Sequence, residues 1–205
     1  MEVKFGKTIK TYLIDGAPNG RLACELSNWT GKIYKIPRTL IKESIERKEL
    51  NSTGVYILFG KDPSDPDTEM AYIGETEDIM DRFRDHLDKK EFWNESLAII
   101  SKDDNLNKAH VKYLEFRMYE IAISVGRYRL DISRIPTRPT ISESDIAEME
   151  EFLYNMKLLI NSLGYKVFEQ LKQIKNNKLN TFGIQATRGA NAEGIPTTEG
   201  FVVLA

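Results

Sequence analysis

Two apolar stretches decide the fold, GVYILFG at Gly54–Gly60 and MAYIG at Met70–Gly74. Each has the length and the β-branched and aromatic content of a buried strand, and each ends at a glycine. The segment between them, Lys61–Glu69, holds two prolines and four acidic residues, which predicts a solvated loop. We therefore expect two neighbouring strands of one sheet, joined by a long polar connection.

The elements that follow indicate a mixed α/β fold. Thr76 is placed to cap a helix that runs through Leu87, and Leu97–Ile100 has the pattern of a third strand. A long amphipathic helix is predicted over Asn105–Val125. Strands interleaved with helices predict a small three-stranded sheet, mixed or antiparallel and flanked by helices, in a domain over residues 53–140.

The segment before this domain, residues 1–52, has a different pattern. Polar and apolar residues alternate in Lys10–Ile14 and Arg21–Leu26, across a loop rich in Gly, Asn and Pro, and Gly31–Ile36 resembles a third short strand. Apolar residues then recur at helical intervals within Thr39–Glu49. The sequence thus predicts a β-rich N-terminal segment that ends in a helix.

Two further segments follow the domain. Residues 141–168 read as a helical extension, because Ser142 and Asp145 open a capping pattern ahead of an amphipathic stripe. Residues 169–205 read as a linker and the start of a C-terminal unit containing β-strands. The apolar run Phe201–Ala205 indicates a strand whose partner lies beyond the end of this chain, or one that pairs elsewhere.

Composition excludes several classes of protein. The chain has 205 residues with 29 Lys+Arg against 31 Asp+Glu, which argues against a uniformly basic protein that coats nucleic acid. A local basic groove remains compatible with this balance. The one cysteine, Cys24, rules out an intrachain disulfide, and no apolar stretch is long enough to cross a membrane. We expect a cytoplasmic protein.

Five residues near the central stretches form a candidate site. Tyr56 and Tyr72 lie on neighbouring strands, so their phenols can stand side by side. Arg82 and His86 are four residues apart on one predicted helix and share a face. Glu115 lies in the middle of the long helix, where burying a carboxylate is costly unless a cation accompanies it.

Each of these residues also has an ordinary structural interpretation. Tyrosine is common in strands and most often packs in the core. Arg82 and His86 taken alone are typical of a solvated helix face. Glu115 has Lys112 and Arg117 available as ion-pair partners in the same helix. It is the ordered set, rather than any one member, that favours a functional site.

The ordered set resembles the GIY-YIG nuclease family. The two motifs that name the family correspond here to Gly54-Val55-Tyr56 and Tyr72-Ile73-Gly74. The family's helix arginine corresponds to Arg82, eight residues after the second motif, and a histidine one turn later corresponds to His86. The family's metal-binding glutamate corresponds to Glu115.

This resemblance covers about residues 53–130, and the flanks resemble a bacterial subgroup with a β-rich segment before the nuclease domain and a poorly characterised domain after it. Three departures stand out besides Val55 in the first motif. The motifs are separated by the long Lys61–Glu69 segment, which we expect only to lengthen the hairpin, and Glu75 stands where several members carry lysine. Many members have an asparagine after the glutamate helix, whereas the nearest place here reads Asp131-Ile132-Ser133.

The resemblance implies a Mg²⁺-dependent DNA endonuclease, with Mn²⁺ as an alternative ion. Glu115 would hold the metal and Arg82 would bind phosphate oxygens. Tyr56 would orient or deprotonate the attacking water, which requires nearby cations to lower its pKa from about 10. Tyr72 and His86 would support this arrangement through hydrogen bonds or proton transfer.

The expected DNA-binding element is an arginine-rich loop. Within Arg127–Arg138 there are four arginines and a single acid, Asp131; the arginines are Arg127, Arg129, Arg134 and Arg138. Two other functions stay open beside the nuclease. One is a nucleic-acid-binding module on a nuclease scaffold that has lost turnover. The other is an interaction module in which the tyrosines and the glutamate only pack.

Overall fold

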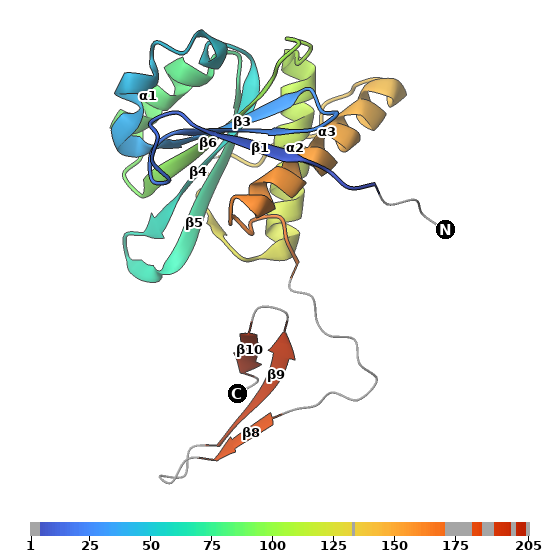
Figure 1. Ribbon diagram of the computed structural model, residues 1–205. Helices are drawn as coiled ribbons and strands as arrows, with labels where there is room; N and C mark the ends of the chain where they lie inside the picture. Colours follow the sequence, from blue (N-terminus) through green and yellow to red (C-terminus); the bar gives the residue numbers. More distant parts are fainter. Residues whose placement is uncertain (1–4, 133, 171–181, 186–190, 198–199, 204–205) are drawn as a thin grey trace. The chain divides into compact units, whose positions relative to one another are not determined.

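The computed structural model describes residues 5–132, 134–170, 182–185, 191–197 and 200–203. The chain divides into two compact units, Met1–Phe168 and Glu169–Ala205 (Figure 1). In the second unit, β8 (Phe182–Gln185), β9 (Asn191–Thr197) and β10 (Gly200–Val203) form an antiparallel sheet with β9 in the middle. No helix in the described part of the chain has the length and hydropathy needed to cross a membrane.

The first unit is built on a seven-stranded sheet with the order β1-β2-β3-β6-β4-β5-β7. All neighbouring strands run antiparallel except β5 and β7, which run parallel. The strands are β1 (Ile9–Leu13), β2 (Leu22–Leu26), β3 (Gly31–Pro37), β4 (Gly54–Asp62), β5 (Asp65–Thr76), β6 (Trp93–Ser101) and β7 (Arg129–Leu130).

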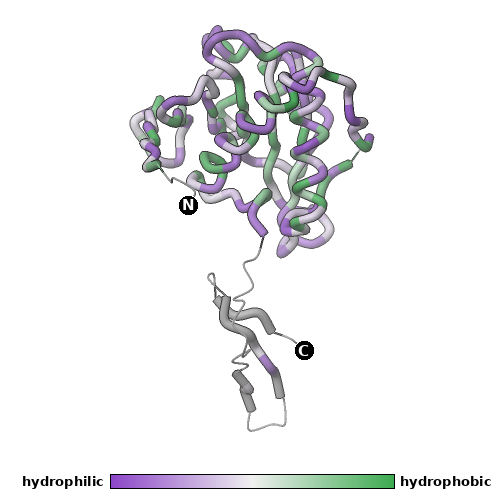
Figure 2. The backbone as a smooth tube through the Cα atoms, turned by 90° about the vertical axis from the view of Figure 1, so that its right-hand side faces the viewer, coloured by the Kyte–Doolittle hydropathy of each residue, from purple (hydrophilic) through white to green (hydrophobic). Residues whose placement is uncertain are grey.

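Helices cover both faces of this sheet, so the central strands are buried on both sides. The helices are α1 (Ile79–Lys89), α2 (Lys108–Val125) and α3 (Glu143–Ser162). Along β4, Val55 and Ile57 belong to the core beneath α2 and α3, whereas Tyr56 and Leu58 belong to the core beneath α1. This double burial explains why β4 reads as a nearly continuous apolar run. In Figure 2 hydrophobic and hydrophilic segments alternate along the chain, as they do in amphipathic elements.

The mixed α/β class is confirmed, but the prediction of a three-stranded sheet is wrong in size. The predicted core of three strands is present as β6-β4-β5. Alone, β6 would expose one edge of unpaired backbone groups. Here β3 occupies that edge in a continuous register from Gly31↔Ser101 to Pro37↔Glu95. The N-terminal strands therefore extend the same sheet.

The predicted helix over Thr39–Glu49 is wrong. The structure has three single 3₁₀ turns there, η1 (Arg38–Leu40), η2 (Lys42–Ser44) and η3 (Lys48–Leu50). Two of the apolar residues that suggested a helix, Ile41 and Leu50, are fully buried, but Ile45 is 42% exposed. The apolar residues thus do not form one continuous helical face, and two separate anchors suit short turns.

The predicted loop Lys61–Glu69 is also shorter than expected. Strand β4 continues to Asp62 and β5 begins at Asp65, so most of the segment is a hairpin extension. The Asp62 carboxylate accepts hydrogen bonds from the backbone and hydroxyl of Ser64, at 2.8 and 2.7 Å, and so closes the turn. Polar composition here reflects an exposed hairpin rather than irregular structure.

The ends of the helices follow their capping residues. Ser142 caps α3 as predicted, since its hydroxyl accepts a 3.1 Å hydrogen bond from the backbone of Asp145. Helix α2 begins after Asn107, whose side chain caps it. Helix α1 is capped by Asp78 and not by Thr76, which instead bonds to the backbone of Asp78.

Candidate active site

The pairing of β4 with β5 brings the two phenols together. Tyr56 lies opposite Gly74, and Leu58 lies opposite Tyr72, so the two tyrosines are diagonal neighbours on one face. Their ring centroids are 6.0 Å apart. The Tyr56 ring lies directly over Gly74, where an added Cβ would come within 2.4 Å of the Tyr56 hydroxyl. Gly74 therefore makes this arrangement possible because it has no side chain.

Helix α1 places Arg82 and His86 against the same tyrosines. The Nε2 atom of His86 lies 2.8 Å from the Tyr56 hydroxyl, a hydrogen bond between two buried side chains. The His86 ring also contacts Tyr72, with 5.1 Å between centroids. Arg82 is exposed on the same side of α1, and the Tyr56 phenol beside it raises the pKa of its guanidinium. Four of the five predicted residues thus form one group.

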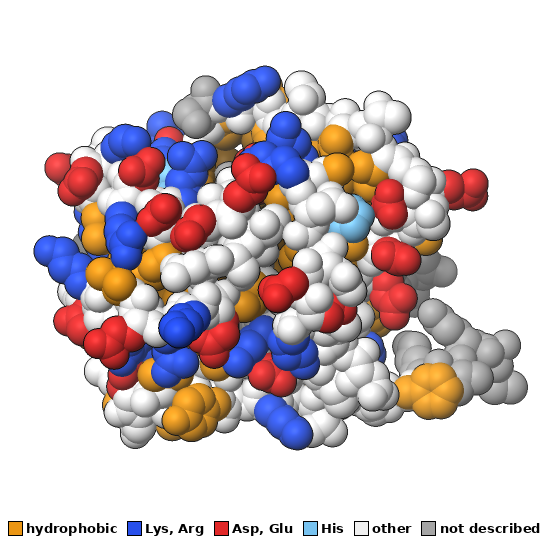
Figure 3. Space-filling view, turned by 90° about the horizontal axis from the view of Figure 1, so that it is seen from above, with side chains coloured by type: hydrophobic (Ala, Val, Ile, Leu, Met, Phe, Trp, Pro, Cys, Tyr) orange, Lys and Arg blue, Asp and Glu red, His pale blue; other side chains and the backbone are white. Residues whose placement is uncertain are grey.

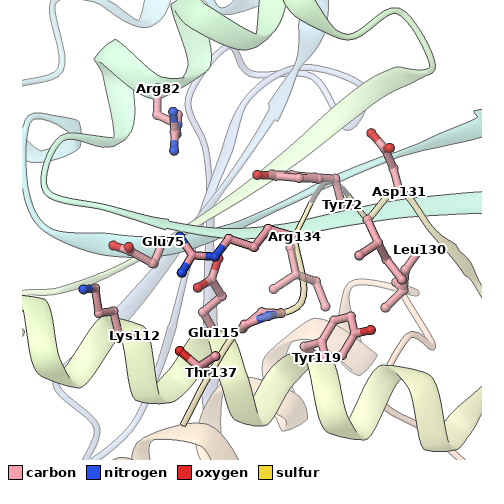
Figure 4. A pocket seen from close by; sticks show the side chains of 13 residues that line it. Tyr72, Glu75, Arg82, Lys112, Glu115, Tyr119, Leu130, Asp131, Arg134 and Thr137 are labelled. Carbon is pink, nitrogen blue, oxygen red and sulfur yellow. The ribbon is translucent and has the colours of Figure 1, made fainter. Parts of the chain in front are cut away.

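Glu115 joins this group through a pocket of about 320 Å³. The pocket lies between β5, α1, α2 and the segment after β7 (Figure 4). Three predicted residues line it, Tyr72, Arg82 and Glu115, although they are separated by up to 43 positions in the sequence (115 − 72 = 43). Tyr56 and His86 do not line it and lie behind Tyr72 and Arg82. The other residues that line the pocket are Ile73, Glu75, Lys112, Tyr119, Leu130, Asp131, Ile132, Arg134, Pro136 and Thr137.

Glu115 has no ion-pair partner among the described residues. Arg117, a partner considered from the sequence, instead binds Glu150 at 2.6 Å and Glu120 at 2.7 Å. Burial raises the pKa of Glu115 to about 7, and the negative charge of Glu75 acts in the same direction. Glu75 itself pairs with Lys108 at 2.9 Å. Arg82, Lys112 and Arg134 also line the pocket, but none of them forms an ion pair with the carboxylate of Glu115.

The electrostatics of Tyr56 differ from the sequence-based expectation. Burial raises the pKa of Tyr56, the neighbouring Tyr72 acts in the same direction, and the opposing effect of Arg82 is smaller. Burial, together with the positive charges of Arg82 and Lys90, lowers the pKa of His86 to about 4. At neutral pH the pair is thus an uncharged phenol hydrogen-bonded to an uncharged imidazole. Arg82 does not by itself produce the expected lowering of the Tyr56 pKa, because desolvation is the larger effect.

The four predicted DNA-binding arginines do not form one patch, and on the face shown in Figure 3 Lys and Arg side chains are interspersed with Asp and Glu. Arg129 is paired with Asp62 at the tip of the β4–β5 hairpin. Arg134 lines the candidate pocket, whereas Arg138 lines a separate hollow beside Arg117 and Glu150. Arg127 is half-buried. Of the four, Arg134 alone is placed at the candidate site.

Several residues of the site were not predicted from the sequence. Lys90 at the end of α1 pairs with Asp131 at 2.5 Å, and its ammonium lies 4.2 Å from the centroid of the Tyr72 ring. Tyr119 lies one helical turn after Glu115, and this spacing was the only sequence signal that could have placed it in the pocket. The pairing of Lys90 with Asp131 joins segments 41 positions apart and has no local signal.

The carboxylates that line the pocket, those of Glu75 and Glu115, are suited to bind a divalent cation. The described residues contain no group of three or more side chains suited to hold a metal. Mg²⁺ is usually bound by one or two carboxylates and completes its shell with water and substrate phosphate. Glu115 with its neighbour Glu75 is such a set, since both carboxylates line the pocket. The residues present are thus compatible with magnesium.

Comparison with known proteins gives no assignment. No protein-family model, no curated protein and no solved structure matches this chain. Function is therefore inferred from the geometry of the site and from the resemblance of its motifs.

Proposed function

We propose that this protein is a Mg²⁺-dependent DNA endonuclease that hydrolyses phosphodiester bonds, with a GIY-YIG-like arrangement over residues 53–130. One observation carries the proposal. Tyr72, Arg82 and Glu115, which come from β5, α1 and α2, line the same pocket. A phenol, a guanidinium and an unpaired carboxylate are the groups that hydrolysis of a phosphodiester needs in one place.

Each residue has a role that follows from its position. Arg82 is permanently charged and binds two non-bridging oxygens of the scissile phosphate through its forked guanidinium. Glu115, with Glu75 beside it, holds the divalent ion. The chemistry that such an ion supplies is Lewis-acid stabilisation of the charge on the phosphate and on the leaving 3′ oxygen.

The phenol that meets the attacking water is Tyr72 in this proposal. Tyr72 is half-buried and lines the pocket, whereas Tyr56 is fully buried behind it. Tyr56 and His86 hold each other through their hydrogen bond and support the ring of Tyr72 from behind. This assigns to Tyr72 the water-orienting role that the motif resemblance implied for Tyr56.

The direct test is cleavage of DNA by purified protein with Mg²⁺. Supercoiled plasmid and short oligonucleotides of several forms are the substrates. Glu115→Gln and Arg82→Met should each lower the rate at least about a hundredfold, because each removes charge stabilisation of the transition state. Glu120→Gln is the matched control, since Glu120 is on the same helix but outside the pocket. Full activity of Glu115→Gln would refute the proposed role.

A second candidate is nucleic-acid binding without cleavage. Two observations favour it, the complete burial of the Tyr56 hydroxyl and the Lys90–Asp131 ion pair at the place where the resembling family has asparagine. This candidate predicts that the protein retards DNA in gels in a salt-sensitive way and cuts none of the tested forms. Retardation that is unchanged in Arg82→Ala and Glu115→Gln would separate it from the nuclease.

A further inference from the structure

The candidate pocket has two chemically different halves. In Figure 4, Glu75, Lys112, Glu115 and the guanidinium of Arg134 gather on one side, with Arg82 above them. Tyr119, Leu130 and Asp131 lie on the other side, where the Asp131 carboxylate is paired with Lys90. Ile132 and Pro136 add further apolar lining. The charged half contains the groups proposed for hydrolysis, and the apolar half has no role in that chemistry.

Helix α2 contributes to both halves from one face. Glu115 and Tyr119 are four residues apart, so they share a face and lie about 6 Å apart along the helix axis. The next residue on this face, Ile123, is 52% exposed. The helix surface therefore changes from a carboxylate to an aromatic ring and then to an exposed aliphatic side chain.

The segment after β7 adds apolar side chains at the mouth of the pocket. Ile132 and Pro136 both line the pocket, and Ile132 is 45% exposed. Between them in the sequence, Arg134 extends its guanidinium toward Glu75 and Glu115 (Figure 4). One short segment thus presents a cation toward the charged half and aliphatic side chains beside the apolar half.

We propose that the pocket takes an unstacked nucleotide, with its phosphate between Arg82 and Arg134 and its base against Tyr119. The inference rests on the proposed nuclease function and specifies its substrate class, which is single-stranded or locally unpaired DNA. Phosphate meets the two guanidinium groups in the charged half. The base meets aromatic and aliphatic side chains in the apolar half, where stacking does not depend on base identity.

The geometry disfavours an intact duplex for a physical reason. In a duplex each base is paired and stacked, and it reaches a protein pocket only when the nucleotide is turned out of the helix, at a cost of a few kcal/mol. A single strand does not pay this cost, and a bulged or mismatched position pays less of it. A pocket of about 320 Å³ is at the lower end of the range for sites that enclose a small ligand.

The first test measures binding without divalent cation, so that nothing is cut. The probes are fluorescent oligothymidylate of about 12 nucleotides, an abasic strand of equal length and charge, and a duplex of equal length. Oligothymidylate should bind at least about tenfold more tightly than the abasic strand and more tightly than the duplex. Equal binding of the thymidine and abasic strands would overturn the inference.

Two variants of one residue supply the matched control. Tyr119→Ala should reduce the preference for oligothymidylate over the abasic strand to about onefold, whereas Tyr119→Phe, which keeps the ring, should retain it. Arg134→Met should weaken binding of both strands alike. It should also reduce the slope of log affinity against log salt concentration by about one, as expected for the loss of one phosphate contact. A base preference that survives in a folded Tyr119→Ala protein would place the base elsewhere and refute the assignment.

The second test measures cutting with Mg²⁺ and separates this inference from the nuclease proposal. The expected order of rates is single strand, then bulged duplex, then intact duplex. Base-dependent binding without cutting of any form would support the nucleotide pocket and refute the nuclease. Cutting of intact duplex at the same rate as single strand, with no effect of Tyr119→Ala, would support the nuclease and overturn the inference.

Discussion

At the scale of single residues, the Tyr56–His86 pair shows how burial decides charge. Tyr56 lies beneath α1 and His86 belongs to that helix, and their hydrogen bond joins the Tyr56 hydroxyl to Nε2 of His86 away from solvent. Between about pH 4 and 6.5 a solvated histidine is mostly charged, whereas buried His86 is neutral. Folding therefore changes the affinity of His86 for a proton. This change makes the stability of the protein depend on pH.

We expect His86 to stabilise the protein increasingly as pH rises from about 4 to 6.5. In this window the unfolded state binds a proton at His86, whose ordinary pKa is 6.5, whereas the native state, with a pKa of about 4, does not. The free energy of unfolding therefore rises with pH, by roughly 2–3 kcal/mol across the window. Above pH 6.5 this contribution is complete.

The measurement compares urea unfolding of the wild type with that of His86→Gln, which does not titrate, from pH 4.5 to 7. The difference in free energy of unfolding between the two proteins should shrink toward low pH. The comparison is needed because Glu115 acts in the opposite direction. Its raised pKa means that the native state binds the extra proton between about 4.5 and 7, so its contribution falls as pH rises. A difference that is constant with pH would mean that His86 titrates alike in both states.

At the scale of elements, the β4–β5 pair depends on close contact at Gly74. A methyl group there would come within 2.4 Å of the Tyr56 ring and hydroxyl. Tyr56 cannot move aside easily, because its ring also packs against the rings of Phe83 and His86. The distances between ring centroids are 5.6 Å and 5.4 Å. The contact therefore couples the register of two strands to the position of α1.

Gly74→Ala should lower the free energy of unfolding by about 1–3 kcal/mol, as expected for overpacking in a core. It should also lower DNA binding or cleavage, because a displaced Tyr56 shifts His86 and Tyr72. Gly6→Ala is the control, since nothing lies within 4 Å of a Cβ at that position. Urea unfolding followed by fluorescence measures both variants. Equal stabilities would show that the ring moves without cost.

Most elements of the first unit could be predicted from the sequence because their apolar patterns are strong. The strand at Gly54–Gly60 and the helices α2 and α3 are where the patterns place them. The turns after Pro37 were missed because apolar residues recurred at helical intervals without sharing a buried face. The two strands of the hairpin were expected to end before Lys61 and to begin after Glu69, because exposed strands and loops have similar compositions.

At the scale of the molecule, the N-terminal strands are part of the sheet that carries the candidate site. Strand β3 covers the edge of β6, and Arg38, just after it, binds the end of α1. Its guanidinium donates hydrogen bonds to the carbonyls of Leu87 at 2.8 Å and Lys90 at 2.6 Å. Helix α1 in turn carries Arg82 and His86.

A protein of residues 1–168 should therefore unfold cooperatively, whereas a protein of residues 53–168 should not fold. The shorter protein loses the seven-residue register of β3 with β6 and the bonds of Arg38, and it exposes a long strand edge. Near-ultraviolet circular dichroism and thermal unfolding measure both. Native-like dichroism of the shorter protein would show that the sheet of β4, β5 and β6 is stable alone.

Three central members of the candidate site could be predicted from the sequence, but their surroundings could not. Tyr72, Arg82 and Glu115 were identified by motif resemblance, and the structure places them around one pocket. Pattern alone could not show that Tyr56 would be fully buried, since alternation along a strand does not say how thickly each face is covered. Pattern alone also could not show that the four arginines lie apart. Arg129, for example, pairs with Asp62, which is 67 positions away in the sequence.

The strand order has a consequence for biosynthesis. Strand β6 lies between β3 and β4 in the sheet but is made after both. As the nascent chain leaves the ribosome, β3 and β4 each keep one unsatisfied flank until Ser101 has emerged. Partly synthesised chains would therefore expose two unpaired strands at once. Neighbouring nascent chains on one polysome should tend to associate through these strands unless a chaperone covers them.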